Sequence, residues 1–229
     1  MPWTTSIEEM SRLAVAYYRM RLIKYPNHPS EPFANWVQSR PFDYPDLLYT
    51  GHDILDVGAG PMTTLGNQGV SIRAVDIFAD EYNILLDELG WSPPVRTERC
   101  TAEALDDLFC PASMDFIHCK NGLDHYLNPK QALEKMVTVL KPNGVFYLEA
   151  YEYEGRSCGY REMHQWDIWT TGVSPDSLMN GGEVWIQGKT TDVESIVDLS
   201  RGQLRVQSIQ RQGRNSSIVL RKLDLEIDE

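Results

Sequence analysis

Residues 53–61 read DILDVGAGP. The apolar residues of this stretch are interrupted by Asp56, and Gly58 and Gly60 follow on either side of one alanine. The short apolar run predicts a buried strand, and glycines at its end let the backbone turn sharply and let another group approach closely. Because ligands of open parallel sheets bind beyond the carboxyl ends of the strands, this stretch predicts a binding turn.

Strand and helix patterns alternate along the middle of the chain. The predicted strands cover residues 53–57, 71–77, 94–100, 114–119 and 145–150. The predicted helices between them cover residues 81–90, 103–108 and 129–140. Short strands that alternate with helices indicate βαβ units and a mostly parallel sheet.

The two ends of the chain depart from this alternation. Residues 5–24 predict one helix with acidic residues in its first turn, and a short helix is predicted near residues 33–38. Tyr18 is among the aromatic residues of this segment, which suit a lid that excludes water from a cleft. After residue 151, the sequence predicts two aromatic-rich strands, HQWDIW and EVWIQG, then a helix over DVESIVDL and a hairpin around GRN.

These patterns together predict an α/β fold. We expect a Rossmann-like, doubly wound, mostly parallel sheet with a C-terminal antiparallel hairpin, an N-terminal helical cap and a β-rich insertion after the fifth strand. The expected organisation is one domain over residues 1–229. Within it we expect the cap (1–50), the core (51–150), and the insertion with the terminal strands (151–229).

The composition narrows the classes of partner. The chain has 229 residues, 42% of them hydrophobic, and a formal net charge of −12. Such a charge repels phosphate backbones and anionic lipid heads, so we expect neither nucleic acid nor a membrane as partner. No run approaches the roughly 18 apolar residues of a membrane helix. The opening MPWTTSIEEM lacks the basic and apolar regions of a signal peptide, so we expect a cytoplasmic protein.

The cysteines show no metal-binding pattern. No pair has CxxC spacing, and no histidine lies at a zinc-finger distance from them. We therefore expect reduced thiols and no metal centre. The four residues are Cys100, Cys110, Cys119 and Cys158.

A second carboxylate indicates the kind of ligand. Asp76 ends the second predicted strand, where an acidic residue accepts hydrogen bonds from both hydroxyls of a ribose. A dinucleotide fingerprint needs a third glycine, but Thr63 occupies that position, and Pro61 has no N–H to offer a pyrophosphate. Asp56 beside the turn favours a cationic ligand over a phosphate. S-adenosylmethionine (SAM) meets these requirements, because it is a nucleoside with a sulfonium and an amino group and without phosphate.

Five motifs follow one another between about residues 50 and 150: ILDVGAGP, AVDI, CTAEAL, MDFIHCKNGLDHYLNP and LKPNGVFYLE. In this order they resemble the successive motifs of class I SAM-dependent methyltransferases, and most closely the small-molecule group called type 11. The resemblance implies the Rossmann-like fold, SAM as cofactor and S-adenosylhomocysteine as its product. One departure is Met62, which stands where the family often has a third glycine.

The resemblance also implies cofactor contacts at the positions that match the motifs. Asp56, Gly58 and Gly60 match the residues at the methionine end of SAM. Asp76 matches the ribose-binding acid, and Ile77 matches the apolar residue against the adenine. The remaining matches lie around the adenine, at Ala102 and Glu103, and beside the amino group, at Cys119 and Asn121.

Two histidines are candidates for the acceptor side of the site. His125 follows Asp124 after the fourth strand, where acid–histidine pairs are frequent in the resembling group and often structural. His164 begins a His-Gln-Trp run after the fifth strand, which some members of the group share. A base within hydrogen-bond reach promotes transfer to a hydroxyl or an amine, so both histidines are predicted to deprotonate or bind the acceptor. A packing role is the alternative for each.

The predicted function is transfer of a methyl group from SAM to a small-molecule acceptor. The pattern leaves O- and N-methylation open, and it identifies neither the acceptor nor the oligomeric state. Two other functions stay as alternatives: a non-catalytic SAM-binding protein of the same fold, and an NAD-dependent oxidoreductase. Thr63 at the third-glycine position counts against the oxidoreductase.

Overall fold

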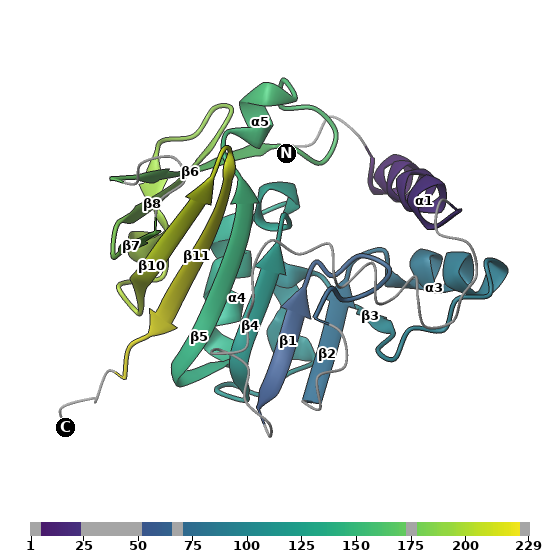
Figure 1. The fold of residues 1–229 in the computed structure, drawn as a ribbon, viewed down its shortest axis with the longest axis horizontal. Helices are drawn as coiled ribbons and strands as arrows, with labels where there is room; N and C mark the ends of the chain where they lie inside the picture. The colour runs from purple at the N-terminus through teal and green to yellow at the C-terminus, as the bar shows by residue number, and fades with distance from the viewer. Residues whose placement is uncertain (1–5, 24–51, 66–70, 173–177, 225–229) are drawn as a thin grey trace.

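The computed structural model describes residues 6–23, 52–65, 71–172 and 178–224. The helix predicted near residues 33–38, with most of the expected cap, lies outside these ranges. Among the described residues, eight strands form one sheet in the order β3-β2-β1-β4-β5-β11-β10-β7. Three further strands form a second sheet in the order β6-β8-β9 (Figure 1).

Five neighbouring strands of the large sheet run parallel, as the sequence predicts. In β1, β4 and β5 most residues are buried and most of the buried ones are apolar, as in sheets that are covered on both faces. The chain order reverses between β1 and β4, and ligands of open α/β sheets bind in the crevice beyond the carboxyl ends of the strands at such a switch point. The strands are β1 (Asp53–Val57), β2 (Ser71–Asp76), β3 (Thr97–Arg99), β4 (Met114–Lys120) and β5 (Leu140–Tyr151).

The other three strands of the large sheet are antiparallel. β10 (Leu204–Gln212) and β11 (Asn215–Lys222) form the predicted C-terminal hairpin. Its turn contains Gly213 at φ +59°, the left-handed conformation that two-residue hairpin turns favour and glycine adopts easily. β7 (Leu178–Asn180) pairs with β10 and was not predicted from the sequence.

The insertion after β5 forms the small sheet, and its two aromatic-rich strands are confirmed. The helix predicted over residues 192–199 is wrong in its first half, because residues there pair with β8 as a short strand. Only α6 (Ile196–Leu199) is helical, and it begins where the Ser195 hydroxyl accepts a hydrogen bond from the backbone N–H of Val197. The strands are β6 (Trp166–Thr171), β8 (Glu183–Gly188) and β9 (Glu194–Ser195).

Helices pack on the sheet and beside its parallel edge (Figure 1). α4 (Pro129–Val139) begins after Asn128, whose side chain accepts a hydrogen bond from the backbone N–H of Gln131, and Pro129 suits the first turn. α1 (Ile7–Ile23) packs against α3 (Ala79–Glu88). The short helices are η1 (Ala102–Asp107), η2 (Leu123–His125) and α5 (Glu154–Ser157).

Two apolar clusters cover opposite faces of the parallel strands. Leu55, Ile117 and Phe146 belong to the larger cluster, which includes the buried face of α4. Ile54 and Phe116 belong to the other cluster. Neighbouring residues point to opposite faces, as the two-residue period of a strand requires. No helix in the described ranges combines the length and the apolar character needed to cross a bilayer.

Candidate functional site

The turn after β1 places two glycines in the crevice. Gly58 and Gly60 have φ angles of +73° and +65°, in the left-handed region that glycine adopts without a Cβ clash. The N–H of Gly58 donates to the carbonyl of Val75 at 2.9 Å, so the turn is fixed to the neighbouring strand β2. The sharp turn predicted from DVGAG is therefore present at the switch point.

Two tyrosine hydroxyls approach these glycines closely. A Cβ built on Gly60 would lie 2.7 Å from the hydroxyl oxygen of Tyr18, and a Cβ built on Gly58 would lie 3.0 Å from that of Tyr126. Burial raises the pKa of Tyr18, and the negative charge of Asp76 raises it further. Because the N–H of Gly60 donates to Asp76, the Tyr18 hydroxyl of α1 lies near the carboxylate at the end of β2.

Asp76 is held at the end of β2 by the backbone. Its Oδ2 accepts a hydrogen bond from the N–H of Gly60 at 3.0 Å, and its Oδ1 accepts one from the N–H of Phe78 at 2.9 Å. Burial raises the pKa of this carboxyl to about 6, and the charges of Asp56 and Glu81 add to the rise, while the two hydrogen bonds oppose it. The carboxylate is thus oriented next to the glycine turn, as the sequence predicts.

Asp56 serves the framework of the site. Its side chain is buried, its Oδ1 lies 2.7 Å from Nδ1 of His118, and its Oδ2 accepts a hydrogen bond from the Thr63 hydroxyl at 2.5 Å. These contacts join the glycine turn to β4. Sequence reasoning missed both partners. A histidine inside a buried strand was the available signal for His118, because a buried polar group needs a partner.

Apolar side chains and one hydrogen-bonded carboxylate lie at the positions predicted to surround the adenine. The N–H of Cys100 donates to the carbonyl of Asp76 at 3.2 Å, which brings the start of η1 beside the end of β2. Ala102 is buried there, and Ile77 packs against a neighbouring apolar cluster. Oε1 of Glu103 instead accepts a hydrogen bond from the backbone N–H of Asn128, the residue before α4, so this oxygen links η1 to that helix.

The residue after β4 carries a buried acceptor atom. Asn121 has a φ of +48°, and its N–H donates to the carbonyl of Glu149 at 2.8 Å. Its Oδ1 is buried and has no hydrogen-bond partner among the described residues. A buried acceptor without a donor is costly, so this oxygen suits a ligand that brings one. The preceding residue, Cys119, is buried with its Sγ 3.3 Å from the hydroxyl of Tyr126.

The two candidate histidines meet at one carboxylate. Nδ1 of His164 lies 2.9 Å from Oδ2 of Asp124, and Nε2 of His125 lies 3.1 Å from Nδ1 of His164. Nε2 of His125 is also 3.3 Å from Oδ2 of Asp124. Burial lowers the pKa of His125, whereas the hydrogen bond with Asp124 raises the pKa of His164. The sequence predicted each histidine separately, and the structure brings them together.

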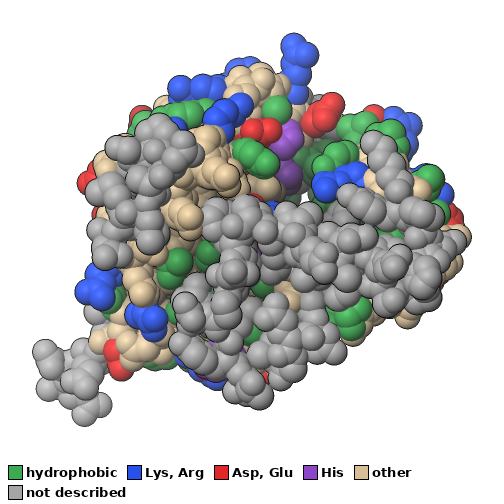
Figure 2. Space-filling view, viewed as in Figure 1, with side chains coloured by type: hydrophobic (Ala, Val, Ile, Leu, Met, Phe, Trp, Pro, Cys, Tyr) green, Lys and Arg blue, Asp and Glu red, His purple; other side chains and the backbone are tan. Residues whose placement is uncertain are grey.

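The insertion is tied to the loop after β4 by further hydrogen bonds. The backbone N–H of Gln165 donates to the carbonyl of Asp124 at 3.2 Å, and Nε1 of Trp166 donates to the carbonyl of Tyr126 at 3.0 Å. These contacts hold His164 over η2. Figure 2 shows histidine and acidic side chains exposed together on this side of the molecule.

Comparison with known proteins gives this site a context. Residues 55–148 match the family described as a methyltransferase domain. The ubiquinone biosynthesis O-methyltransferase of Ralstonia nicotianae is 26% identical over 147 residues. This alignment covers 62% of the present chain and 59% of the Ralstonia protein, so it spans less than two thirds of that relative.

Solved structures share the fold. A SAM-dependent methyltransferase of Methanosarcina mazei has a TM-score of 0.51 at 17% identity, with 79% of this chain and 98% of that chain covered. A second structure is that of the 1,6-didemethyltoxoflavin-N1-methyltransferase of Burkholderia thailandensis, solved with 1,6-didemethyltoxoflavin and S-adenosylhomocysteine. It has a TM-score of 0.51 at 18% identity, with 94% of this chain and 87% of that chain covered. This chain therefore shares the fold of SAM-dependent methyltransferases, and its match to the methyltransferase-domain family falls on the residues that carry the predicted motifs.

Proposed function

We propose that this protein transfers a methyl group from SAM to a small-molecule acceptor. One observation carries the proposal: at the carboxyl ends of two parallel strands of one sheet lie an oriented carboxylate, Asp76 at the end of β2, and the group of Asp124, His125 and His164 after β4. A nucleoside-binding carboxylate and a polar acceptor side at one switch point suit group transfer between two bound molecules.

The proposed cofactor site fits SAM in its polar and apolar groups. The Asp76 carboxylate suits the two ribose hydroxyls, and Ile77 with Ala102 suits the adenine. The unpartnered Oδ1 of Asn121 and the backbone at Cys119 suit the amino group. Bound there, SAM supplies an electrophilic methyl carbon. The remaining predicted residues shape the site. Gly58 and Gly60 form the turn with positive φ angles, and the Asp56 and Glu103 carboxylates accept hydrogen bonds from other residues of the protein.

On the acceptor side, we assign the binding and activation of the acceptor to His164 and His125. Both side chains are partly exposed, with 29% and 28% of their surface accessible, so an acceptor can reach them. Asp124 is the positioning residue, because its buried carboxylate contacts both rings. Methyl transfer has a good leaving group, so holding the acceptor oxygen or nitrogen in line is the main task of these residues.

The net charge of −12 supports a small acceptor over a nucleic acid. The Burkholderia structure contains a small heterocyclic substrate, and the Ralstonia relative is an O-methyltransferase, so small-molecule acceptors are the first to screen. Thr63 weighs against an NAD-dependent oxidoreductase for a second reason, because its hydroxyl is committed to Asp56. We also propose that residues 1–229 form one domain and that the protein is located in the cytoplasm.

Calorimetric titration of the purified protein with SAM, S-adenosylhomocysteine and NAD tests the cofactor. We expect micromolar binding of SAM and its product and none of NAD. Asp76→Ala removes the oriented carboxylate and is expected to abolish SAM binding. Asp80→Ala is the matched control, because Asp80 is an exposed carboxylate nearby in the sequence whose partner is Arg99.

Binding of NAD in place of SAM would overturn the proposal. SAM binding that survives in Asp76→Ala would show that the cofactor lies elsewhere. Where SAM binds as expected, incubation with isotopically labelled SAM and a panel of phenols, hydroxy acids and amines identifies the acceptor. Retained binding with no transfer to any of them would favour the non-catalytic alternative.

A further inference from the structure

Three potential ligand atoms converge on one point in the acceptor side. Oδ2 of Asp124, Nε2 of His125 and Nδ1 of His164 form a triangle with edges of 2.9, 3.1 and 3.3 Å. They come from η2 and from the segment before β6, which lie about 40 residues apart in the chain. Each atom therefore faces the other two at hydrogen-bond distance.

Protons alone do not satisfy this arrangement. Each ring nitrogen carries either one in-plane proton or one lone pair at this position. A protonated nitrogen donates along one edge and accepts along none, so no placement of protons gives all three edges their own hydrogen bond. At least one edge is left with two donors, two lone pairs or a shared proton. A cation at the centre of the triangle would instead be attractive to all three atoms.

The size of the triangle matches the coordination shell of a transition metal. With metal–ligand bonds of about 2.0–2.1 Å, adjacent ligand atoms are about 2.8–3.0 Å apart in octahedral and about 3.3–3.4 Å apart in tetrahedral geometry. The three observed edges fall between these limits. Two imidazoles and one carboxylate are also a donor set that divalent transition metals prefer, with coordination positions left for water or substrate.

Hydrogen bonds and unusual backbone angles fix the segment that carries His164. Gln165 follows His164, and its side-chain amide donates to the carbonyls of Tyr160 and Glu162 at 3.2 and 2.8 Å. Tyr160 and Glu162 have φ angles of +52° and +53°, and such conformations in residues other than glycine cost energy and cluster at functional sites. The backbone is therefore shaped to present His164 to Asp124.

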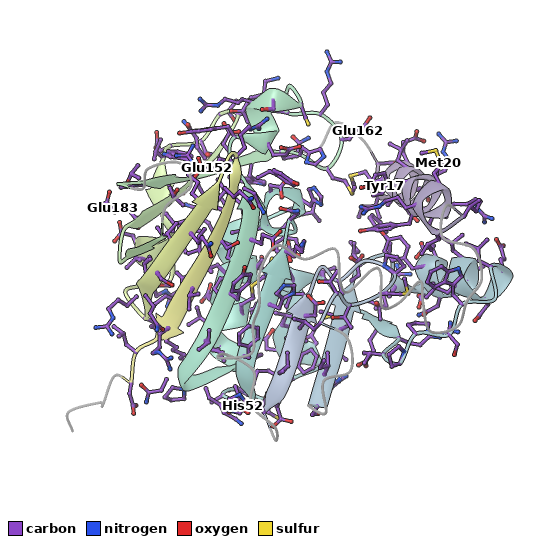
Figure 3. All side chains as sticks on the ribbon, viewed as in Figure 1. Tyr17, Met20, His52, Glu152, Glu162 and Glu183 are labelled. Atoms are coloured by element: carbon purple, nitrogen blue, oxygen red, sulfur yellow. The ribbon has the colours of Figure 1, made fainter. Side chains whose placement is uncertain are left out.

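Additional donors lie next to the triangle. Glu154, Cys158 and His164 form a second group whose possible ligand atoms lie within 4.8 Å of one another. Figure 3 shows the turn with Glu162 on the same side of the molecule as Tyr17 and Met20 of α1. A carboxylate and a thiol thus lie next to a centre whose two histidines are partly exposed.

We propose that Asp124, His125 and His164 bind a divalent transition-metal ion of the Zn²⁺ class, with open positions toward the acceptor. The cysteine spacing predicts no metal centre, and the three ligands proposed here come from two segments that are distant in the chain. The binding of the ion stands independently of the proposed function. Its use rests on that function, and it narrows the acceptor to a molecule with a hydroxyl group able to coordinate the ion.

The role of the ion would be to acidify and hold the acceptor hydroxyl, since a coordinated oxygen loses its proton near neutral pH. The hydroxyl proton leaves to solvent. The oxygen then forms a C–O bond with the methyl carbon of SAM as the S–CH₃ bond breaks, and the electron pair of that bond stays on sulfur. The products are a methyl ether and S-adenosylhomocysteine, so charge and atoms balance.

The test is titration of the full, untagged chain with Zn²⁺ after dialysis against a chelator. We expect one Zn²⁺ per chain by calorimetry, and a visible Co²⁺ absorption spectrum typical of four or five ligands. His164→Gln, His125→Gln and Asp124→Asn should each weaken Zn²⁺ binding by about 100-fold, because each removes one ligand. At a Zn²⁺ concentration about ten times the wild-type dissociation constant, Zn²⁺ should raise the melting temperature of the wild type and hardly change that of the three variants.

Glu162→Gln is the matched control, because it removes a negative charge beside His164 without removing a ligand. It should bind Zn²⁺ like the wild type, as should His52→Gln, which changes a histidine outside the site. Circular dichroism establishes whether each variant is folded. If Asp124→Asn unfolds, the two histidine variants still test the proposal, because their side chains are partly exposed. No Zn²⁺ binding by the wild type, or equal binding by the folded histidine variants, overturns the proposal. SAM binding, measured on the same samples, reports separately on the proposed function.

Discussion

The hydroxyl of Tyr18 occupies the space in which Gly60 would carry a Cβ, since a Cβ built there would lie 2.7 Å from that oxygen. Tyr18 belongs to α1 and Gly60 to the turn after β1. The N-terminal helix therefore contacts the glycine turn directly, next to Asp76. This contact makes the stability of the turn and the position of α1 depend on one another.

Replacing Gly60 tests this dependence. Gly60→Ala adds a Cβ at a φ of +65° and pushes on Tyr18, so we expect a loss of unfolding free energy above the ~1–2 kcal/mol typical of a left-handed alanine, together with weaker SAM binding. Urea denaturation measures the first and calorimetry the second. Gly213→Ala is the control, because Gly213 has a similar φ of +59° and open space around it. Equal losses in the two variants would mean that the Tyr18 contact contributes nothing.

The affinity for SAM is expected to depend on pH through Asp76. In the proposed complex the ribose hydroxyls donate to the ionised carboxylate, and the pKa of this group is raised to about 6. Protonation therefore opposes binding as the pH falls: affinity should be nearly constant above pH 7 and should fall about tenfold per pH unit well below pH 6. Calorimetry from pH 5 to 8 measures this dependence. Asp76→Asn should bind weakly with no inflection near pH 6, and a wild type with the same flat profile would contradict the assignment.

The buried contacts of Asp56 predict a large effect on stability. Asp56→Ala leaves His118 and Thr63 without their partner in a closed environment, so we expect a loss of about 3–5 kcal/mol in the free energy of unfolding. Thr63→Ala removes one neutral donor and should cost about 1–2 kcal/mol. Urea denaturation of both variants gives the comparison. If Asp56→Ala loses only SAM affinity and no stability, the framework role of Asp56 is wrong.

Glu152 should hold the insertion on the large sheet. It is buried after β5, and its Oε1 accepts hydrogen bonds from the backbone N–H and the hydroxyl of Thr170 and from the hydroxyl of Ser216, at 3.0, 2.5 and 2.8 Å. Glu152→Ala leaves these donors unsatisfied, so we expect a loss of about 3 kcal/mol or more and weaker Zn²⁺ binding, since His164 lies on the same segment.

Glu183→Ala provides the matched control for that prediction. Glu183 accepts a hydrogen bond from the Thr171 hydroxyl at 2.9 Å, but on the exposed edge of the insertion (Figure 3). Its removal should change stability by less than about 1 kcal/mol. Comparable losses in the two variants would show that the burial of Glu152 has no particular importance for the insertion.

Local patterns were sufficient for the core of the fold and for part of the cofactor side. The strand at residues 53–57, the glycine turn and Asp76 were predicted because apolar periodicity and turn chemistry lie within a few neighbouring residues. The helix predicted over residues 192–199 failed where cross-strand pairing with β8 outweighed a helical pattern. The tyrosine contacts with the glycines were also missed, because they depend on how α1 and the loop after β4 are packed.

The sequence by itself determined the mostly parallel sheet, the glycine turn and the carboxylate at the end of the second strand, because each is encoded by residues that are close in the chain. Only the tertiary structure decided which distant groups meet. Asp124 and His164 are 40 residues apart, and Asp56 and His118 are 62 apart. Strand order and the packing of the insertion bring each pair together. These depend on burial and hydrogen bonding over the whole chain, and no local period records them.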